Sequence, residues 1–126
     1  MYSVEVSSAG DYLFRVKAND YEFEVDAKGR GATPPDTLLA SLGSCVGVYI
    51  RKYAEGARLA IDEFTVKVSG ELCKEAPARF KTIDVSVGLR GSALDERRRK
   101  ALIEFIKNCP VHNTLRSDPE IKIRIE

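Results

Sequence analysis

Net charge is nearly absent from this sequence of 126 residues, which has 20 Lys and Arg against 19 Asp and Glu. A formal net charge of +1 gives no general attraction to nucleic acids or anionic membranes. Long hydrophobic segments are also missing: the longest apolar run, residues 38–50, is too short to span a bilayer and is interrupted by serine and glycine. The first residues alternate like a strand and lack the basic and apolar regions of a signal peptide. We therefore expect a cytoplasmic protein with no membrane or nucleic-acid partner.

Cysteine is scarce and odd in number: Cys45, Cys73 and Cys109. An odd count is not typical of the disulfide framework of a small secreted domain. In a reducing compartment such cysteines act as buried packing residues, metal ligands or redox groups. Cys73 falls on the polar side of its predicted strand, and we expect it to be dispensable.

The length and composition indicate a single domain over residues 1–126, since 44% hydrophobic and 31% charged residues are ordinary for globular proteins. Alternating apolar and polar residues predict strands, and apolar residues at helical spacing predict helices. The predicted strands are residues 2–7, 12–17, 21–26, 64–73, 83–89 and 121–125, and the predicted helices are residues 36–55 and 92–108. This β-β-β-α-β-β-α-β order indicates an α+β fold with antiparallel sheets around two main helices.

Each predicted helix carries a cysteine on its apolar stripe. Cys45 lies on helix 36–55, and Cys109 lies near the end of helix 92–108, where a capping box of Ser92 and Asp95 marks the start. Pro110 either ends the second helix or begins a new turn. If the two stripes share one core, the thiols can meet in an apolar pocket. A thiolate there could attack the O–O bond of a peroxide, and the second thiol could convert the resulting sulfenic acid into a disulfide.

The predicted helix 36–55 is apolar on nearly every side, which one small domain has difficulty covering. Its smallest residues, Gly43, Ser44 and Gly47, are expected to let another helix approach closely. A two-fold contact is the commonest form of oligomer, so we expect a homodimer.

Two segments carry a family resemblance: TPPDTLLASLGSC, residues 33–45, and CPVHNTL, residues 109–115. Together they resemble the two cysteine motifs of the OsmC/Ohr family, and the order of the predicted elements also matches. The resemblance implies a thiol peroxidase that reduces organic hydroperoxides, with Cys45 as the attacking and Cys109 as the resolving cysteine. It further implies an intertwined dimer in which both subunits line each pocket. The reaction would take electrons from a dithiol reductant and would need no metal, haem or flavin.

The acidic residue and the arginine of the family pattern are harder to assign in this sequence than the two cysteines. Family members usually carry a glutamate nine or ten residues before the first cysteine, where it orients an arginine. Asp36 stands nine residues before Cys45 and is the candidate, although an acid in the first turn of a helix is also favoured by the helix dipole.

The family's arginine follows the first strand in Ohr-type members, but this sequence has Ala9, Gly10 and Asp11 there. Arg15 points outward by strand alternation, so Arg30 in the loop before the helix is the better substitute. This departure from the Ohr pattern indicates the more divergent OsmC-like branch.

Three further interpretations concern the remaining polar residues. His112 could act as a base or stabilise a thiolate near Cys109, although a lone histidine is more often a surface or capping residue. A metal module of Cys45, Cys109 and His112 would lack the fourth ligand that structural zinc usually has. The basic run 97–100 is interpreted as a solvated helix face.

The alternative function is a non-catalytic OsmC-like protein that binds a small apolar ligand.

Overall fold

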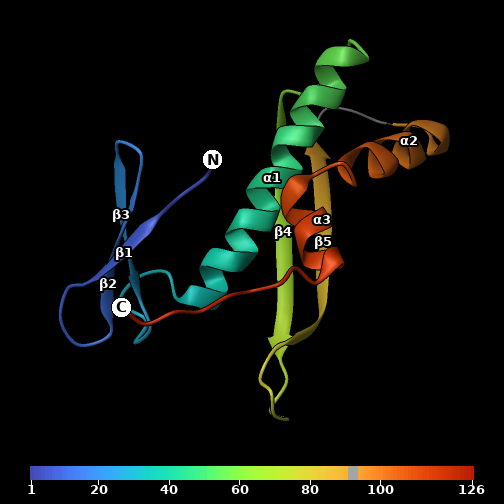
Figure 1. Cartoon of the computed structure of the whole chain (residues 1–126). Coiled ribbons are helices and arrows are strands. Elements are labelled where there is room, and N and C mark those ends of the chain that lie inside the picture. Colours follow the sequence, from blue (N-terminus) through green and yellow to red (C-terminus); the bar gives the residue numbers. More distant parts are fainter. Residues whose placement is uncertain (91–93) are drawn as a thin grey trace. The chain divides into compact units, whose positions relative to one another are not determined.

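The computed structural model describes residues 1–90 and 94–126, so the predicted capping residue Ser92 lies outside the described residues (Figure 1). The elements are β1 (Glu5–Ser8), β2 (Leu13–Ala18), β3 (Tyr21–Asp26), α1 (Pro34–Gly56), β4 (Glu63–Leu72), β5 (Phe80–Arg90), α2 (Glu96–Ile106) and α3 (Pro110–Ser117). The predicted α+β class with antiparallel pairing is confirmed. The chain divides into two compact units, residues 1–40 and 41–126. In residues 1–90 and 94–126, no helix is both long and apolar enough to cross a membrane.

The first unit is built on an antiparallel sheet in the order β1-β2-β3. Val6, Val16 and Phe23 stand side by side in the register, so the predicted alternation places them on one apolar face. On the opposite face, Arg15 pairs with Glu24 at 3.7 Å, which confirms the outward position predicted for Arg15. Val16 is buried, whereas Val6 remains 56% exposed and Phe23 47% exposed. The apolar face is therefore only partly covered within one chain.

The second unit has its core between α1 and the β4–β5 hairpin, which lie alongside each other in Figure 1. The small residues of α1 make this approach close. A Cβ atom on Gly43 would meet a methyl carbon of Val68 at 3.0 Å, and one on Gly47 would meet the Phe64 ring at 3.5 Å. The prediction that this small face receives another helix is therefore wrong within the chain, since its partner is strand β4. Glycine at the two positions gives room to the large β-sheet side chains.

Buried apolar residues from α1, α2 and the segments next to α2 form one cluster: Leu42, Val46, Ile50, Leu94, Leu102 and Cys109. Ile50 and Cys109 are fully buried. The cluster joins α1 to the C-terminal helices and holds one of the two motif cysteines at its centre.

The end of the chain differs from the sequence prediction. Asp95 is the N-cap of α2, where its side chain accepts a hydrogen bond from the Arg98 N–H at 2.8 Å, and Lys107 is the C-cap. Pro110 begins a separate helix, α3, which ends at Asp118 in the left-handed conformation with φ 49°. The run 97–100 is exposed on α2, as predicted.

No strand forms over residues 121–125, so that prediction is wrong for the single chain. The three isoleucines that suggested it are 80%, 86% and 98% exposed: Ile121, Ile123 and Ile125. A strand needs a neighbour for its backbone N–H and C=O groups, and no strand of the described residues pairs with this segment.

Candidate active site

Cys109 sits at a helix start that its own sequence builds. Pro110 occupies the first position of α3, where its missing N–H costs no hydrogen bond. Cys109 is the N-cap, and its Sγ accepts a hydrogen bond from the His112 N–H at 3.4 Å. The residue is fully buried. The Cys-Pro sequence thus places a sulfur atom at the N-terminal end of a helix.

Cys45 lies on the middle of α1 and is half-buried against the same core cluster. Cys109 and the Val111 N–H in the first turn of α3 both lie near enough to Cys45 to change the pKa of its thiol. The structure therefore brings the two cysteines together as free thiols. It does so at the start of α3, whereas the sequence placed Cys109 on the apolar stripe of the preceding helix.

Opposing influences act on the pKa of the Cys45 thiol. Burial is the largest, and it raises the pKa because a charged sulfur is poorly solvated there. The hydrogen bond with Cys109 acts in the same direction, whereas the Val111 N–H and the positive charge of Lys52 lower the pKa. The net result is a raised pKa, so most of the Cys45 thiol is protonated at neutral pH.

The surroundings of the thiols are apolar and aromatic. Phe105 of α2 packs between two tyrosines of α1, with ring centroids 5.8 Å from Tyr49 and 5.6 Å from Tyr53. Ile106 and Val111 also pack against the cluster that holds Cys109. The packing next to the thiols is therefore apolar and aromatic.

His112 reaches the thiols through its backbone. Its N–H donates to Cys109, while its ring Nδ1 lies 3.2 Å from the Asn113 Oδ1. In residues 1–90 and 94–126, no three His, Cys, Asp or Glu side chains are grouped as metal ligands. The three residues of the metal-module alternative thus do not form a site of that kind in the described chain.

Asp36 and Arg30 belong to the first unit, separately from the two thiols in the second. Asp36 accepts a hydrogen bond from the Thr33 N–H at 3.1 Å, and the Asp36 N–H donates to Thr33 Oγ1 at 3.3 Å. This reciprocal pair caps the start of α1 and lowers the pKa of the Asp36 carboxyl. The geometry fits the helix-capping interpretation of Asp36.

Arg30 is held by a residue that sequence reasoning missed. Its Nε donates to Asp26 Oδ2 at 2.7 Å, and the Asp26 side chain is buried although Arg30 is exposed. The other carboxylate oxygen of Asp26 accepts from the Lys28 N–H at 2.8 Å. Alternation along β3 predicted an outward Asp26, but the loop folds back over it, since the Asp26 N–H donates to the Ala32 carbonyl. An acid four residues before a basic residue, with Gly29 between, was the available signal.

Cys73 lies just beyond β4 and away from a regular strand. Its Sγ accepts a hydrogen bond from Arg79 Nη1 at 3.4 Å and donates toward carbonyls of the hairpin loop. It therefore serves the hairpin and takes no part in the arrangement around Cys45.

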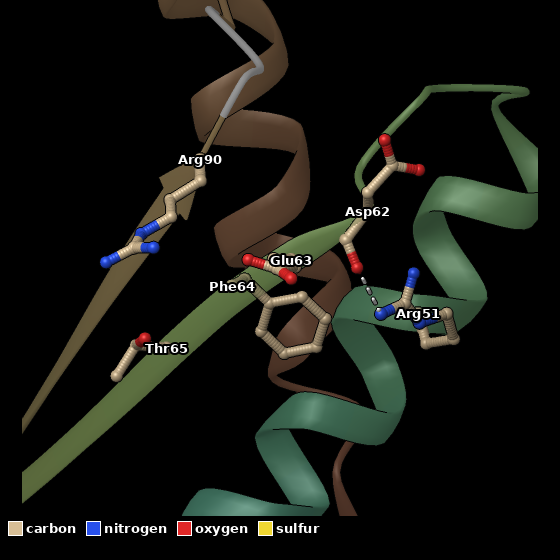
Figure 2. Close-up of a pocket in the computed structure, with 6 residues that line it drawn as sticks. All are labelled: Arg51, Asp62, Glu63, Phe64, Thr65 and Arg90. Atoms are coloured by element: carbon tan, nitrogen blue, oxygen red, sulfur yellow. Dashed lines mark hydrogen bonds between the residues drawn. The ribbon is translucent and has the colours of Figure 1, made fainter.

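A pocket of about 440 Å³ lies at another place in the second unit, where α1 faces the start of β4 and the end of β5 (Figure 2). Arg51 crosses its edge and donates to the carbonyls of Ile61 at 2.6 Å and Asp62 at 3.2 Å. The Arg51 guanidinium also lies over the Phe64 ring, 5.0 Å from its centroid. The remaining lining residues are Glu63, Thr65 and Arg90. Arg51 is thus used to fasten the end of α1 to the hairpin.

Residues 16–124 match the model of the OsmC-like protein family, and the chain belongs to that family. A hydroperoxide reductase of Mycoplasma genitalium is 23% identical over 98% of this chain and 93% of its own length.

Solved structures agree on the fold. An OsmC-like protein from Mycoplasma pneumoniae superposes with a TM-score of 0.83 at 22% identity, over 93% of this chain and 88% of that one. An organic hydroperoxide resistance protein from Elizabethkingia anophelis gives a TM-score of 0.68 at 19% identity, over 94% and 91% of the two chains.

Proposed function

We propose that the chain is a thiol peroxidase that reduces organic hydroperoxides through Cys45 and Cys109. The observation that carries this proposal is the proximity of two free thiols: Cys45 packs against the cluster that holds Cys109, and Cys109 accepts a hydrogen bond from the His112 N–H at the start of α3. The apolar and aromatic surroundings support an organic substrate. The relative named hydroperoxide reductase supports the same chemistry.

The proposed reaction has three steps. The Cys45 thiolate attacks one peroxide oxygen, the O–O bond breaks, and the other oxygen leaves as an alcohol after taking up a proton. Cys45 is then a sulfenic acid. The Cys109 sulfur attacks it, an S–S bond forms, and the hydroxyl leaves as water with the Cys109 proton. A dithiol reductant finally reduces the disulfide by thiol exchange and supplies the two electrons.

The order of the two cysteines follows their exposure. Cys45 is half-buried and can meet a substrate, whereas Cys109 is fully buried. The Val111 N–H, which lowers the pKa of Cys45, favours the thiolate that the first step requires.

We further propose that three residues assist turnover by the two cysteines: Arg30, Asp36 and His112. Asp26 binds Arg30 through Nε, and the two terminal amino groups of the guanidinium do not take part in that ion pair. Replacing each residue singly, as Arg30→Gln, Asp36→Asn and His112→Gln, separates a role in turnover from a role in folding when thermal stability is measured in parallel.

We also propose that the active form is a homodimer. Large apolar side chains are exposed on the N-terminal sheet and along the last residues, including Val6, Phe23 and Ile123. An exposed apolar face is typical of an interaction site, and the segment 121–125, which pairs with no strand of the described residues, has the alternation of a strand. Sedimentation at sub-micromolar concentration should give twice the chain mass of 14.0 kDa. A folded species of the single-chain mass would contradict the dimer.

The decisive experiment is peroxide consumption with a dithiol donor, using cumene hydroperoxide beside hydrogen peroxide. Cys45→Ser should abolish turnover, and Cys109→Ser should allow one turnover and leave Cys45 as a sulfenic acid that a sulfenate reagent traps. Cys73→Ser is the matched control and should retain activity. Peptide mapping of the oxidised protein should find a Cys45–Cys109 disulfide. No turnover with either peroxide would favour the non-catalytic binding of a small apolar ligand.

A further inference from the structure

A positive charge lies on the same face of α1 as the proposed attacking cysteine. Cys45, Tyr49 and Lys52 are spaced by four and three residues, so their side chains follow one another along one side of the helix. Side chains on a helix tilt toward its N-terminus, and a long side chain therefore covers the turn before its own Cα. Lys52 accordingly reaches back along the helix toward Cys45.

The tyrosine between them holds the lysine in this direction. The Lys52 Nζ lies 4.8 Å from the centroid of the Tyr49 ring, within the range of a cation–π contact. The ring itself is fixed on its other contacts by Phe105 of α2. Lys52 is itself exposed to solvent.

We propose that Lys52 is a charge-stabilising residue for the Cys45 thiolate and that Tyr49 is the residue that positions it. This inference rests on the proposed function, because it assigns a role in activating the attacking thiol. The ammonium group makes no bond to sulfur in this role. It lowers the energy of the negative charge through space, by an amount that salt screens.

The other groups described around Cys45 do not supply a positive charge that would stabilise its thiolate. From α3, Cys109 raises the pKa of Cys45, and His112 turns its ring to Asn113. The parts of β4 and β5 that pack on the cluster contribute apolar side chains: Phe64, Val66, Val68, Ile83, Val87 and Leu89. Lys52 is the cation whose charge acts on the Cys45 thiol in the direction of the thiolate.

The test measures thiol reactivity without peroxide. Reduced protein is alkylated with iodoacetamide over a range of pH, and the rate at the Cys45 peptide is followed by mass spectrometry. Lys52→Gln should lower the Cys45 rate at neutral pH about threefold, as expected for the loss of one solvent-exposed charge, and should move the profile to higher pH. Lys52→Arg should keep the wild-type profile. Lys100→Gln, which removes an exposed charge from α2, is the matched control and should change nothing.

Two further variants and one condition sharpen the result. Tyr49→Leu should reproduce part of the Lys52→Gln effect with the lysine still present, and Tyr49→Phe should not, because the phenylalanine ring still holds the cation. Raising the salt concentration should shrink the difference between wild type and Lys52→Gln. A Lys52→Gln profile that superposes on wild type at low salt would overturn the inference. If Lys52→Gln moves the profile but wild type consumes no peroxide, the role of Lys52 stands and the peroxidase proposal fails.

Discussion

Valine side chains are buried to different extents in the N-terminal sheet and in the helical unit. On α1, Val46 is buried in a cluster that includes residues from α2 and the start of α3. On β1, Val6 is equally apolar and equally well placed in its register, yet 56% of it is exposed. The core cluster of the helical unit covers Val46, whereas the β1-β2-β3 sheet leaves part of its apolar face uncovered. The proposed thiol pair lies at the covered cluster, and the uncovered sheet face is part of the proposed dimer contact.

The largest effect should come from placing a charge on the uncovered face. Val6→Asp would bury a carboxylate in the proposed dimer contact, at a cost that such a contact rarely tolerates. We expect dissociation or unfolding, seen as a loss of the species of twice the chain mass in sedimentation. Ser7→Asp is the control: it introduces the same side chain at the next residue, on the opposite face and opposite Arg15. Equal behaviour of the two variants would mean that this face is free in solution.

The next effect compares two valines of α1. Val46→Ala removes buried methyl groups from the core and should lower the free energy of unfolding by roughly 2 kcal/mol, from lost burial and the cavity left behind. Val48 is 50% exposed, and Val48→Ala should cost little because alanine is the better helix former. Urea denaturation measures both. A cost above about 1 kcal/mol for Val48→Ala would indicate that a second chain covers this side of the helix.

A pH effect should arise from Asp26 in the N-terminal unit. The Lys28 N–H and the Arg30 guanidinium hold the pKa of Asp26 below its usual range, against the opposing effect of burial. The stabilisation is therefore complete above the ordinary carboxyl pKa of about 3.9 and is lost as the pH falls toward the lowered value. Asp26→Asn should be less stable at neutral pH and should lose less stability on acidification.

Thermal unfolding between neutral pH and acid checks this expectation. Asp20→Asn in the exposed β2–β3 turn is the control, since it should leave the difference between the two conditions unchanged. Parallel acid profiles for wild type and Asp26→Asn would show that the ion pair with Arg30 contributes nothing measurable.

The smallest effect concerns the cap of α2. Asp95→Ala removes the side-chain acceptor for the Arg98 N–H and should cost about 1 kcal/mol, whereas Asp95→Ser should restore most of it. Urea denaturation of the three proteins checks the ranking. Equal stability of the alanine and serine variants would show that a capping side chain at residue 95 does not stabilise the start of α2.

The sequence predicted the strands of both sheets well because their alternation has one wet face and one dry face. Strand β3 (Tyr21–Asp26) coincides with the predicted strand 21–26. Strands β1, β2, β4 and β5 lie close to their predicted ranges. Helix α3 was harder to predict, because Pro110 is compatible both with ending one helix and with starting another. The segment 121–125 has the pattern of a strand, but a pattern cannot supply the neighbour with which a strand pairs.

At the candidate site, the sequence predicted which cysteines meet but not how they meet. Helical spacing placed Cys45 on the core side of α1, and its proximity to Cys109 followed from a shared core. The N–H groups of Val111 and His112 were not predictable, because backbone donors carry no signal in the residue types. Asp26 was missed for a related reason: its burial depends on the path of the loop that follows it.

The first turn of α3 has one more consequence. Whatever free energy its N–H groups give to a negatively charged sulfur, the charged sulfur returns to the helix, because the linkage between the two equilibria is reciprocal. A helix of 8 residues is marginal without such help. A disulfide carries no negative charge, so after oxidation the N–H groups at the start of α3 have no thiolate to stabilise, and the helix loses that contribution. The backbone amides of residues 111–117 should then exchange with solvent faster in the oxidised protein than in the reduced one, as hydrogen-exchange mass spectrometry would measure.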